Sequence, residues 1–180
     1  NMLNVHQRMA VLKILTYPDP FLLKKAGPVT TFDAKLRRLV ADMFETMRAA
    51  NGIGLAAPQI GESLDLVVLD IPPDEEDDEP LVFAVANPVI TERRGHARIE
   101  EGCLSLPEFY VEVDRAEEIV LEGQDPEGRP IRIEAAGLLA ICFQHELDHL
   151  EGKLLVNYAG DDEREAYRKA VRAKKSAAKS

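Results

Sequence analysis

Two histidines and a glutamate in the segment ICFQHELDHLEG, residues 141–152, have the types and spacing of a metal-dependent hydrolytic centre. His145 and His149 are four residues apart, so on a helix both imidazoles lie on one face and can bind one ion. Glu146 then lies about 100° around the helix from His145. It is near the ion without having to bind it, as a general base for the attacking water must be.

The alternative is a solvated helix with two incidental histidines. The chain has only 4 histidines in 180 residues, and two of them fall in this pattern on an otherwise apolar segment. The pattern alone also occurs in proteins without a metal. The composition of the segment favours the metal site.

A third ligand decides which chemistry such a site supports. Some zinc peptidases with this helix take a glutamate about twenty residues further on, and Glu165 has that spacing from His145. Others take a third histidine six residues after the second, but Leu155 stands there and no histidine follows His149. Glu165 belongs to a charge-rich terminal segment, which makes it the less favoured ligand.

The two cysteines are better placed to complete the site. Cys103 lies in EEGCLSLPE, which can approach from another direction and would give a Cys-His-His site with its fourth position open to water. Cys142 is three residues before His145, and three ligands on one helix leave little room for a tetrahedral arrangement. Cys142 is therefore interpreted as a buried lining thiol. Cys103 could instead be a nucleophile with a histidine as its base, but Glu146 would then have no role.

Several regular elements must position these residues. The segment NGIGLAAPQIGES is expected to be a loop whose glycines let the backbone approach another group closely. Residues 110–137 are expected to form two or three antiparallel strands that turn at 125–128. The apolar periodicities predict helices at residues 31–50 (capped by Asp33) and 138–151, and strands at residues 64–70 and 81–90. The acidic stretch PPDEEDDEP is expected to be a solvated loop rather than a cation site.

The charge distribution limits the partners of the chain. The net charge of −10 argues against a DNA-binding protein. No apolar run approaches the roughly 18 residues needed to span a membrane, and no secretory signal is apparent, so a cytoplasmic location with reduced cysteines is expected. Residues 168–180 carry six basic residues and no acid, which leaves −10 − 6 = −16 for the rest. A terminal helix that frays into a basic tail is expected there.

Three segments resemble the signature motifs of the peptide deformylase family, in the same order and with similar spacing. They are GIGLAAPQ (52–59), EGCLSLP (101–107) and QHELDHLEG (144–152). The segment YPDP (17–20) also resembles the family, so the resemblance covers most of residues 14–157. It implies an α+β fold of antiparallel strands around a central helix that carries the HExxH motif, with a C-terminal helix, in a single catalytic domain, residues 1–180.

The resemblance also implies the function. The family removes the formyl group from the N-terminal methionine of newly made bacterial and organellar proteins. Carried over by position, it implies one divalent metal ion held by Cys103, His145 and His149, with Fe2+ as the native ion and Zn2+, Ni2+ or Co2+ also suited. It implies Glu146 as the general acid/base. Gln59 and the backbone N–H of Leu104 would stabilise the oxyanion.

The same resemblance assigns the substrate-binding residues. The backbone of Gly54 would bind the substrate peptide, and the pocket for the methionine side chain would be lined by Ile53, Ile99, Ile141 and Cys142. The expected partners are formyl-methionine nascent polypeptides and, through residues 168–180, the ribosome. Two alternatives stay open: a metallopeptidase that uses Glu165 as a ligand, and a metal-binding module without catalysis.

Overall fold

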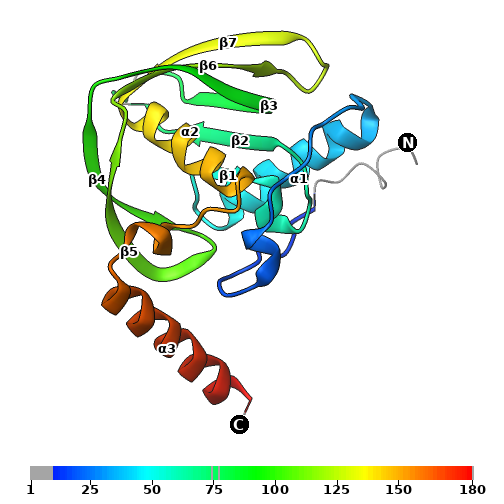
Figure 1. Cartoon of the computed structure of the whole chain (residues 1–180). Helices are drawn as coiled ribbons and strands as arrows, with labels where there is room; N and C mark the ends of the chain where they lie inside the picture. The colour runs from blue at the N-terminus through cyan, green and yellow to red at the C-terminus, as the bar shows by residue number, and fades with distance from the viewer. Residues whose placement is uncertain (1–9, 74, 77, 180) are drawn as a thin grey trace.

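Two antiparallel sheets and three α-helices make up the part of the chain that the structure, a computed structural model, describes: residues 10–73, 75–76 and 78–179. The larger sheet has the strand order β1-β2-β3-β6-β7, and the smaller one pairs β4 with β5 (Figure 1). Their bounds are β1 Gly54–Ala56, β2 Leu66–Ile71, β3 Leu81–Arg94, β4 Ala97–Cys103, β5 Leu106–Arg115, β6 Glu118–Gln124 and β7 Pro130–Ala136. The helices are α1 Ala34–Ala49, α2 Gly137–Leu150 and α3 Asp161–Ala178.

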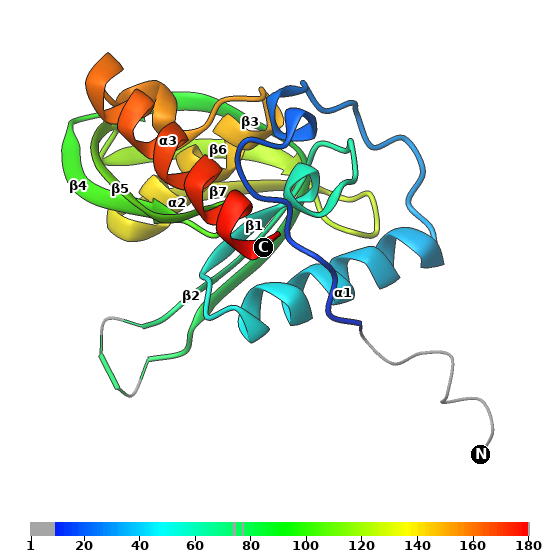
Figure 2. The same ribbon diagram turned by 90° about the horizontal axis from the view of Figure 1, so that it is seen from below.

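Strand β2 is buried between two helices, which explains its continuous apolar sequence LVVL. Leu66 and Val68 pack into a cluster with α1, whereas Val67 and Leu69 pack into a second cluster with α2. Successive side chains of a strand point to opposite faces, so β2 has to be apolar on both. Figure 2 shows α1 lying along β1 and β2.

Helix α1 begins at the predicted cap. The Asp33 side chain accepts a hydrogen bond from the backbone N–H of Leu36 at 3.0 Å. The buried face of the helix then carries Leu36, Val40, Met43, Thr46 and Met47. This spacing matches the periodicity from which the helix is predicted.

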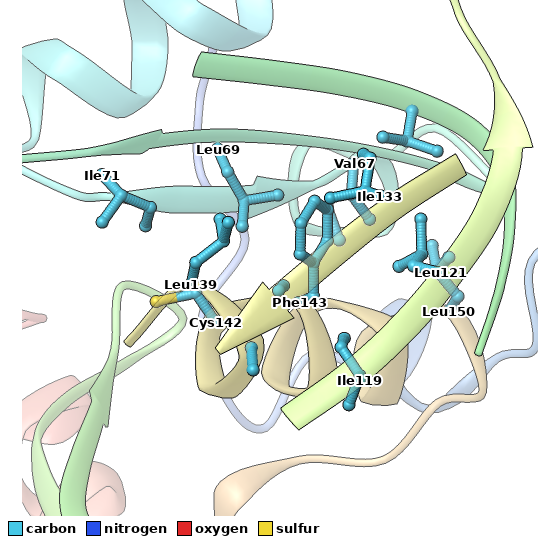
Figure 3. Packing of buried hydrophobic residues seen from close by; sticks show 14 of the residues in the cluster. Val67, Leu69, Ile71, Ile119, Leu121, Ile133, Leu139, Cys142, Phe143 and Leu150 are labelled. Carbon is cyan, nitrogen blue, oxygen red and sulfur yellow. The ribbon is translucent and has the colours of Figure 1, made fainter. Parts of the chain in front are cut away.

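Helix α2 is fixed by apolar packing against the larger sheet. Phe143 is fully buried, and Figure 3 shows it among side chains of β2, β6 and β7. Leu139, Cys142 and Leu150 belong to the same cluster. The helix that bears both histidines therefore has a rigid backing.

The β4–β5 hairpin approaches α2 from the other side and is held there by polar and apolar contacts. The Gln144 side chain exchanges two hydrogen bonds of 2.9 Å with the backbone of Ala116, just after β5. A third cluster packs the hairpin against η4 (Leu155–Tyr158) through Leu106, Phe109, Val113 and their neighbours. Cys103 is the last residue of β4, so this packing decides where its thiol lies.

The predicted elements are found, with differences at their ends. The helices predicted at 31–50 and 138–151 and the strands predicted at 64–70 and 81–90 are confirmed. Residues 51–63, predicted as a loop, contain β1 and the 3-10 helix η3 (Ala57–Ile60), and β4 is not predicted at all. Helix α3 continues through Ala178, where the sequence predicts fraying. The acidic loop lies between β2 and β3, and its residues 74 and 77 lie outside the described part. Among the described helices, none is long and apolar enough to cross a membrane.

Candidate active site

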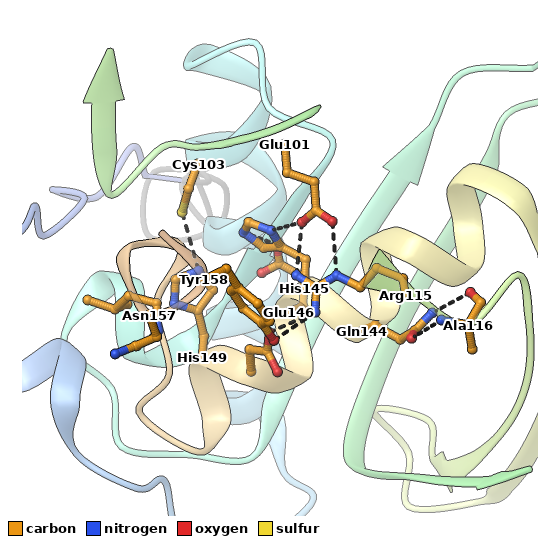
Figure 4. Close-up of polar contacts among 12 residues, drawn as sticks. Glu101, Cys103, Arg115, Ala116, Gln144, His145, Glu146, His149, Asn157 and Tyr158 are labelled. Atoms are coloured by element: carbon orange, nitrogen blue, oxygen red, sulfur yellow. Dashed lines mark hydrogen bonds and ion pairs between the residues drawn. The ribbon is translucent and has the colours of Figure 1, made fainter. Parts of the chain in front are cut away.

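Three potential metal ligands from two elements meet at one point. The Cys103 thiol comes from the end of β4, and His145 and His149 come from successive turns of α2. The ligand atoms of these three residues all lie within 4.8 Å of one another. Cys103 Sγ is 3.3 Å from His149 Nε2, as Figure 4 shows. One ion could contact all three.

The chemistry of these donors fits a divalent transition metal. His149 is 2% exposed, and burial lowers its pKa well below the usual range, with the charges of His145 and Arg115 acting in the same direction. The ring is therefore neutral, as a ligand must be. A thiolate with two neutral imidazoles suits zinc, iron, cobalt or nickel. The three donor side chains are buried or half-buried and face one another, an arrangement that suits the binding of such an ion.

A buried ion pair orients His145. Its Nδ1 lies 2.9 Å from Glu101 Oε1, so Nδ1–H donates to the carboxylate and Nε2 is left for an ion. Arg115 donates two hydrogen bonds of 2.9 Å to Glu101. Arg115 also reaches Asp148 at 2.7 Å, and the Tyr158 hydroxyl donates to the same Asp148 oxygen at 2.6 Å (Figure 4). Helix α2, the hairpin and η4 are joined at this point.

The protonation states follow from these contacts. Burial would raise the pKa of Glu101, but hydrogen bonds from His145 and Arg115 hold it below its usual value, so the carboxylate is ionised. Burial would lower the pKa of His145, but hydrogen bonds to Cys103 and Glu101 raise it well above the usual value. A proton and a metal ion therefore compete for His145 Nε2.

Glu146 lies beside the donors with unused hydrogen-bonding capacity. Its Oε1 is 3.9 Å from His145 Nε2, and its buried Oε2 has no hydrogen-bond partner among the described residues. Burial raises the pKa of Glu146 to about 7, although the charges of His145 and Arg115 act to lower it. A carboxyl group with this pKa can both accept and return a proton at neutral pH.

Gly54 leaves the space that the Glu146 carboxylate occupies. A Cβ atom at position 54 would lie 3.0 Å from Glu146 Oε1 and 3.2 Å from its Cδ. A side chain at position 54 would therefore require the Glu146 carboxylate to shift. The backbone of Gly54 is thereby brought to the pocket.

Gln59 is buried and its amide is held in one orientation. Its Oε1 accepts a hydrogen bond from Ala56 N–H at 2.9 Å, and its Nε2 donates to Ser105 Oγ at 3.0 Å. Nε2 also lies 3.7 Å from Cys103 Sγ. The amide N–H groups therefore point toward the hairpin end that carries Cys103 and Leu104.

These residues line one pocket of about 450 Å³. Of the eleven residues predicted for the site, ten line it, and His149 lies buried behind them. The ten are Ile53, Gly54, Gln59, Ile99, Cys103, Leu104, Ile141, Cys142, His145 and Glu146. The structure thus brings together residues from all three motifs.

The two competing ligand candidates, Cys142 and Glu165, do not belong to the cluster of Cys103, His145 and His149. Burial raises the pKa of the Cys142 thiol to about 12, with the charges of Glu146 and Glu101 acting in the same direction. Cys142 is therefore a protonated thiol within the apolar cluster of α2. Glu165 lies on α3, where its carboxylate pairs with Arg168 at 3.0 Å.

Glu101, Arg115 and Ser105 are contributors that sequence reasoning missed. Glu101 and Ser105 both stand in the segment EGCLSLP, each two residues from Cys103. Their closeness to Cys103 in the sequence could have indicated a role at the site. Arg115 has no comparable signal in the sequence. It stands 14 residues after Glu101, and the β4–β5 pairing brings its Nε to 2.9 Å from the Glu101 carboxylate.

Known proteins resemble this chain over most of its length. The family model for polypeptide deformylase matches residues 11–165. A curated peptide deformylase of Alkalilimnicola ehrlichii is 50% identical over 163 residues, which cover 91% of this chain and 90% of that protein. One of Thermodesulfovibrio yellowstonii is 46% identical over 167 residues, covering 93% and 100%.

Solved structures agree with the sequence relatives. The crystal structure of peptide deformylase from Ehrlichia chaffeensis superposes with a TM-score of 0.88 at 35% identity and covers 93% of this chain and 98% of that chain. The structure from Legionella pneumophila gives a TM-score of 0.84 at 45% identity, covering 92% and 96%. By its sequence, its fold and the residues that meet in its pocket, this chain belongs to the peptide deformylase family.

Proposed function

We propose that this protein is a metal-dependent amidohydrolase that removes the formyl group from the N-terminal formyl-methionine of newly synthesised polypeptides. The observation that carries the proposal is the meeting of Cys103, His145 and His149 beside Glu146, whose buried Oε2 has no hydrogen-bond partner among the described residues. Family membership gives the substrate. Formyl-methionine is the first residue of these polypeptides as they are made, so we infer action in the cytoplasm, where they are synthesised.

A divalent cation held by Cys103, His145 and His149 would supply an acidified water, with a pKa lowered from 15.7 to about 7, and a Lewis acid for the formyl oxygen. We infer Fe2+ as the native ion from the family, and Zn2+, Ni2+ and Co2+ suit the same donors. The hydrogen bond from His145 to Glu101 keeps the other ring nitrogen directed at the ion.

Glu146 moves the protons of the reaction. As the water oxygen bonds to the formyl carbon, Glu146 takes a proton from the water. It then delivers this proton to the nitrogen as the carbon–nitrogen bond breaks. The second hydrogen of the water stays on the formyl carbon's oxygens as formic acid, which passes it to the amine. The products are formate and a protonated N-terminal amine, so atoms and charge balance. Its pKa of about 7 allows both halves of this role at neutral pH.

Gln59 and the backbone N–H of Leu104 are proposed to stabilise the negative charge that develops on the formyl oxygen. The Gln59 amide is held by Ala56 and Ser105, so its orientation is set before the substrate binds. A fixed donor of this kind is typically worth about 3 kcal/mol in the transition state.

The remaining predicted residues hold the substrate. We propose that the Gly54 backbone binds the peptide chain and that Ile53, Ile99, Ile141 and Cys142 surround the methionine side chain. In this reading α2 is the central catalytic helix of a single domain formed by residues 1–180. A non-catalytic module would have no use for a buried, unpartnered Glu146. A peptidase that uses Glu165 would have to bring that residue from α3.

The decisive test compares peptides that differ only at the N-terminus. Formyl-Met-Ala-Ser should give formate and free amine in equal amounts, whereas acetyl-Met-Ala-Ser should be left intact. A Glu146→Gln variant with equal metal content is the control for contaminating activity. Cleavage of internal peptide bonds, or no formate from fully metal-loaded protein, would contradict the proposal.

We further propose that residues 168–180 help the protein reach nascent chains on the ribosome. Helix α3 has no buried residue and projects from the hairpin, with Lys174 paired to Glu108 of β5 (Figure 1). Its basic second half would be attracted to ribosomal RNA, and this attraction weakens as salt rises. A solubilising helix end is the alternative.

Deleting residues 168–180 should leave hydrolysis of a short formyl peptide unchanged and weaken co-sedimentation with ribosomes at low salt. A variant with the six basic residues replaced by glutamine separates charge from length. Co-sedimentation that is unchanged in both variants would contradict a role for this segment.

A further inference from the structure

The apolar lining of the active-site pocket continues from its buried part to its mouth. Cys142 and Ile141 form the buried part of the lining. Toward the outside the lining continues with Ile99, Leu138 and Tyr110, which are 38%, 40% and 63% exposed. Exposed apolar side chains grouped at the rim of a site indicate a binding surface.

The ring of Tyr110 lies over a glycine on the neighbouring strand. Gly102 is its cross-strand partner in the β4–β5 register. A Cβ atom at position 102 would lie 2.8 Å from Tyr110 Cε1 and 3.1 Å from Cδ1. The ring therefore lies across the Gly102 backbone, directly beside Cys103. An aromatic ring set in this way offers a large contact area at low entropic cost.

The side chains of β4 alternate between its two faces, and Tyr110 of β5 lies on the face opposite the histidines. Glu101 and Cys103 contact the histidines of α2, so their side chains point to the inner face. Gly102 lies between them and faces the other way, toward the ring of Tyr110. In the described part of the chain β4 pairs with β5 alone, so its second edge is available to an extended peptide.

A substrate along that edge would alternate in the same way. With its methionine side chain directed at Ile141 and Cys142 on the inner side, the next side chain points to the outer face. Tyr110 is the large apolar group that it would meet there.

We propose that Tyr110 makes the protein selective for substrates whose second residue, directly after formyl-methionine, is large and apolar or aromatic. This inference rests on the proposed function, because it concerns the same pocket. Contacts between an aromatic ring and such a side chain predict a preference of about threefold to about tenfold in kcat/KM.

The test measures kcat/KM for formyl-Met-Phe-Ser, formyl-Met-Ala-Ser and formyl-Met-Ala-Phe. The first should be preferred over the second, and the third should gain little. Tyr110→Ala should bring the Phe-to-Ala ratio close to one while changing kcat/KM for formyl-Met-Ala-Ser by less than about twofold. Tyr110→Phe should keep the preference. Val89→Ala, which removes an exposed apolar side chain of β3 that does not line this pocket, is the matched control.

A charge at the same place gives an independent measurement. Tyr110→Glu should shift the preference toward arginine at the second position, with an effect that declines as salt is added. If no formyl peptide is hydrolysed, the proposed function itself fails. If all are hydrolysed but the ratio is unchanged in Tyr110→Ala and Tyr110→Glu, or if the preference lies at the third residue, the role of Tyr110 is refuted and the function stands.

Discussion

Glu146 and Glu101 are buried acids in the same site whose surroundings shift their pKa values in opposite directions. Glu146 Oε1 is 3.9 Å from His145 Nε2, too far for a hydrogen bond, and burial raises the pKa of Glu146 to about 7. Glu101 accepts hydrogen bonds from His145 and Arg115, which lower its pKa despite burial. One carboxyl group can therefore carry a proton, while the other remains an anion that orients a ligand.

Replacing Glu146 by glutamine should reduce kcat by about 10²-fold to 10⁴-fold or more, because general acid–base catalysis contributes that much and Glu146 acts in two steps. Metal content should be unchanged, because the carboxylate is not a ligand. Steady-state kinetics together with metal analysis of the same sample check both parts. Near-normal turnover at full metal loading would show that another group moves the proton.

The two cysteines should respond differently to substitution. Cys103→Ala removes a thiolate and leaves two imidazoles that hold a divalent ion less tightly, so metal and activity should be lost together. Cys142→Ala removes a protonated lining thiol, so the metal should stay, with a modest change in KM. Air oxidation should add mass at Cys103 and not at Cys142. The reverse pattern of metal loss would make the assigned ligand set wrong.

Arg115→Ala should be strongly destabilising, because it leaves Glu101 buried without its cation. Breaking a buried ion pair on one side costs about 3–5 kcal/mol in the free energy of unfolding. Metal affinity should fall by about 10-fold to 100-fold, since Glu101 would no longer hold His145. Arg98→Ala, which removes an exposed partner of Glu112 and Asp114, is the matched control and should change neither quantity appreciably. Metal affinity unchanged in Arg115→Ala would refute this role.

The end of helix α2 depends on a glycine for a steric reason. Gly152 has φ +74°, and a Cβ atom there would lie 2.4 Å from the carbonyl oxygen of Leu23. Its N–H also donates to the carbonyl of His149 at 3.1 Å. The chain reversal after α2 is therefore linked directly to His149, one of the proposed metal ligands.

Gly152→Ala should lower the free energy of unfolding by about 2 kcal/mol or more, because both the backbone conformation and the contact with Leu23 become unfavourable. Urea denaturation measures this. Gly160→Ala is the matched control: its backbone is extended, a Cβ atom meets nothing within 4 Å, and a change of a few tenths of a kcal/mol is expected. Equal stabilities of the two variants would contradict the steric argument.

Helices and strands with a regular apolar pattern could be predicted from the sequence, and those without one could not. The face of α1 that contains Met43 and Met47 is buried with helical spacing, so its periodicity is visible. Strand β4 has the sequence ARIEEGC. Its buried residue Glu101 forms an ion pair with Arg115 and does not contribute an apolar side chain to a core. Its pattern therefore looks like a solvated segment.

Some contacts of the site could likewise be predicted from the sequence, and others could not. His145 and His149 are four residues apart, so their meeting follows from helix geometry alone. Glu101 and Arg115 meet because β4 and β5 pair in one particular register, which no local pattern specifies. The position of Tyr110 over Gly102 also depends on that register.

The protein as a whole has three hydrophobic clusters among its described residues, and they are built from apolar side chains rather than around an ion. We therefore expect the metal-free protein to stay folded. Chelation should abolish activity and lower the Tm, since an ion that binds the folded state stabilises it by mass action. The far-UV circular dichroism at 25 °C should be unchanged. Loss of the helical signal on chelation would show that the ion holds the fold together.

The distance along the chain between the ligands has a consequence for how the ion is acquired. Cys103 and His149 are 46 residues apart and belong to separate elements, the hairpin and α2. Contacts between distant parts of a chain form late in folding, because the intervening segment has to be ordered first. The three ligands therefore come together only when the hairpin docks on α2. We therefore expect an ion to bind only after folding is nearly complete, so that the ions available to the folded protein would decide which metal is bound.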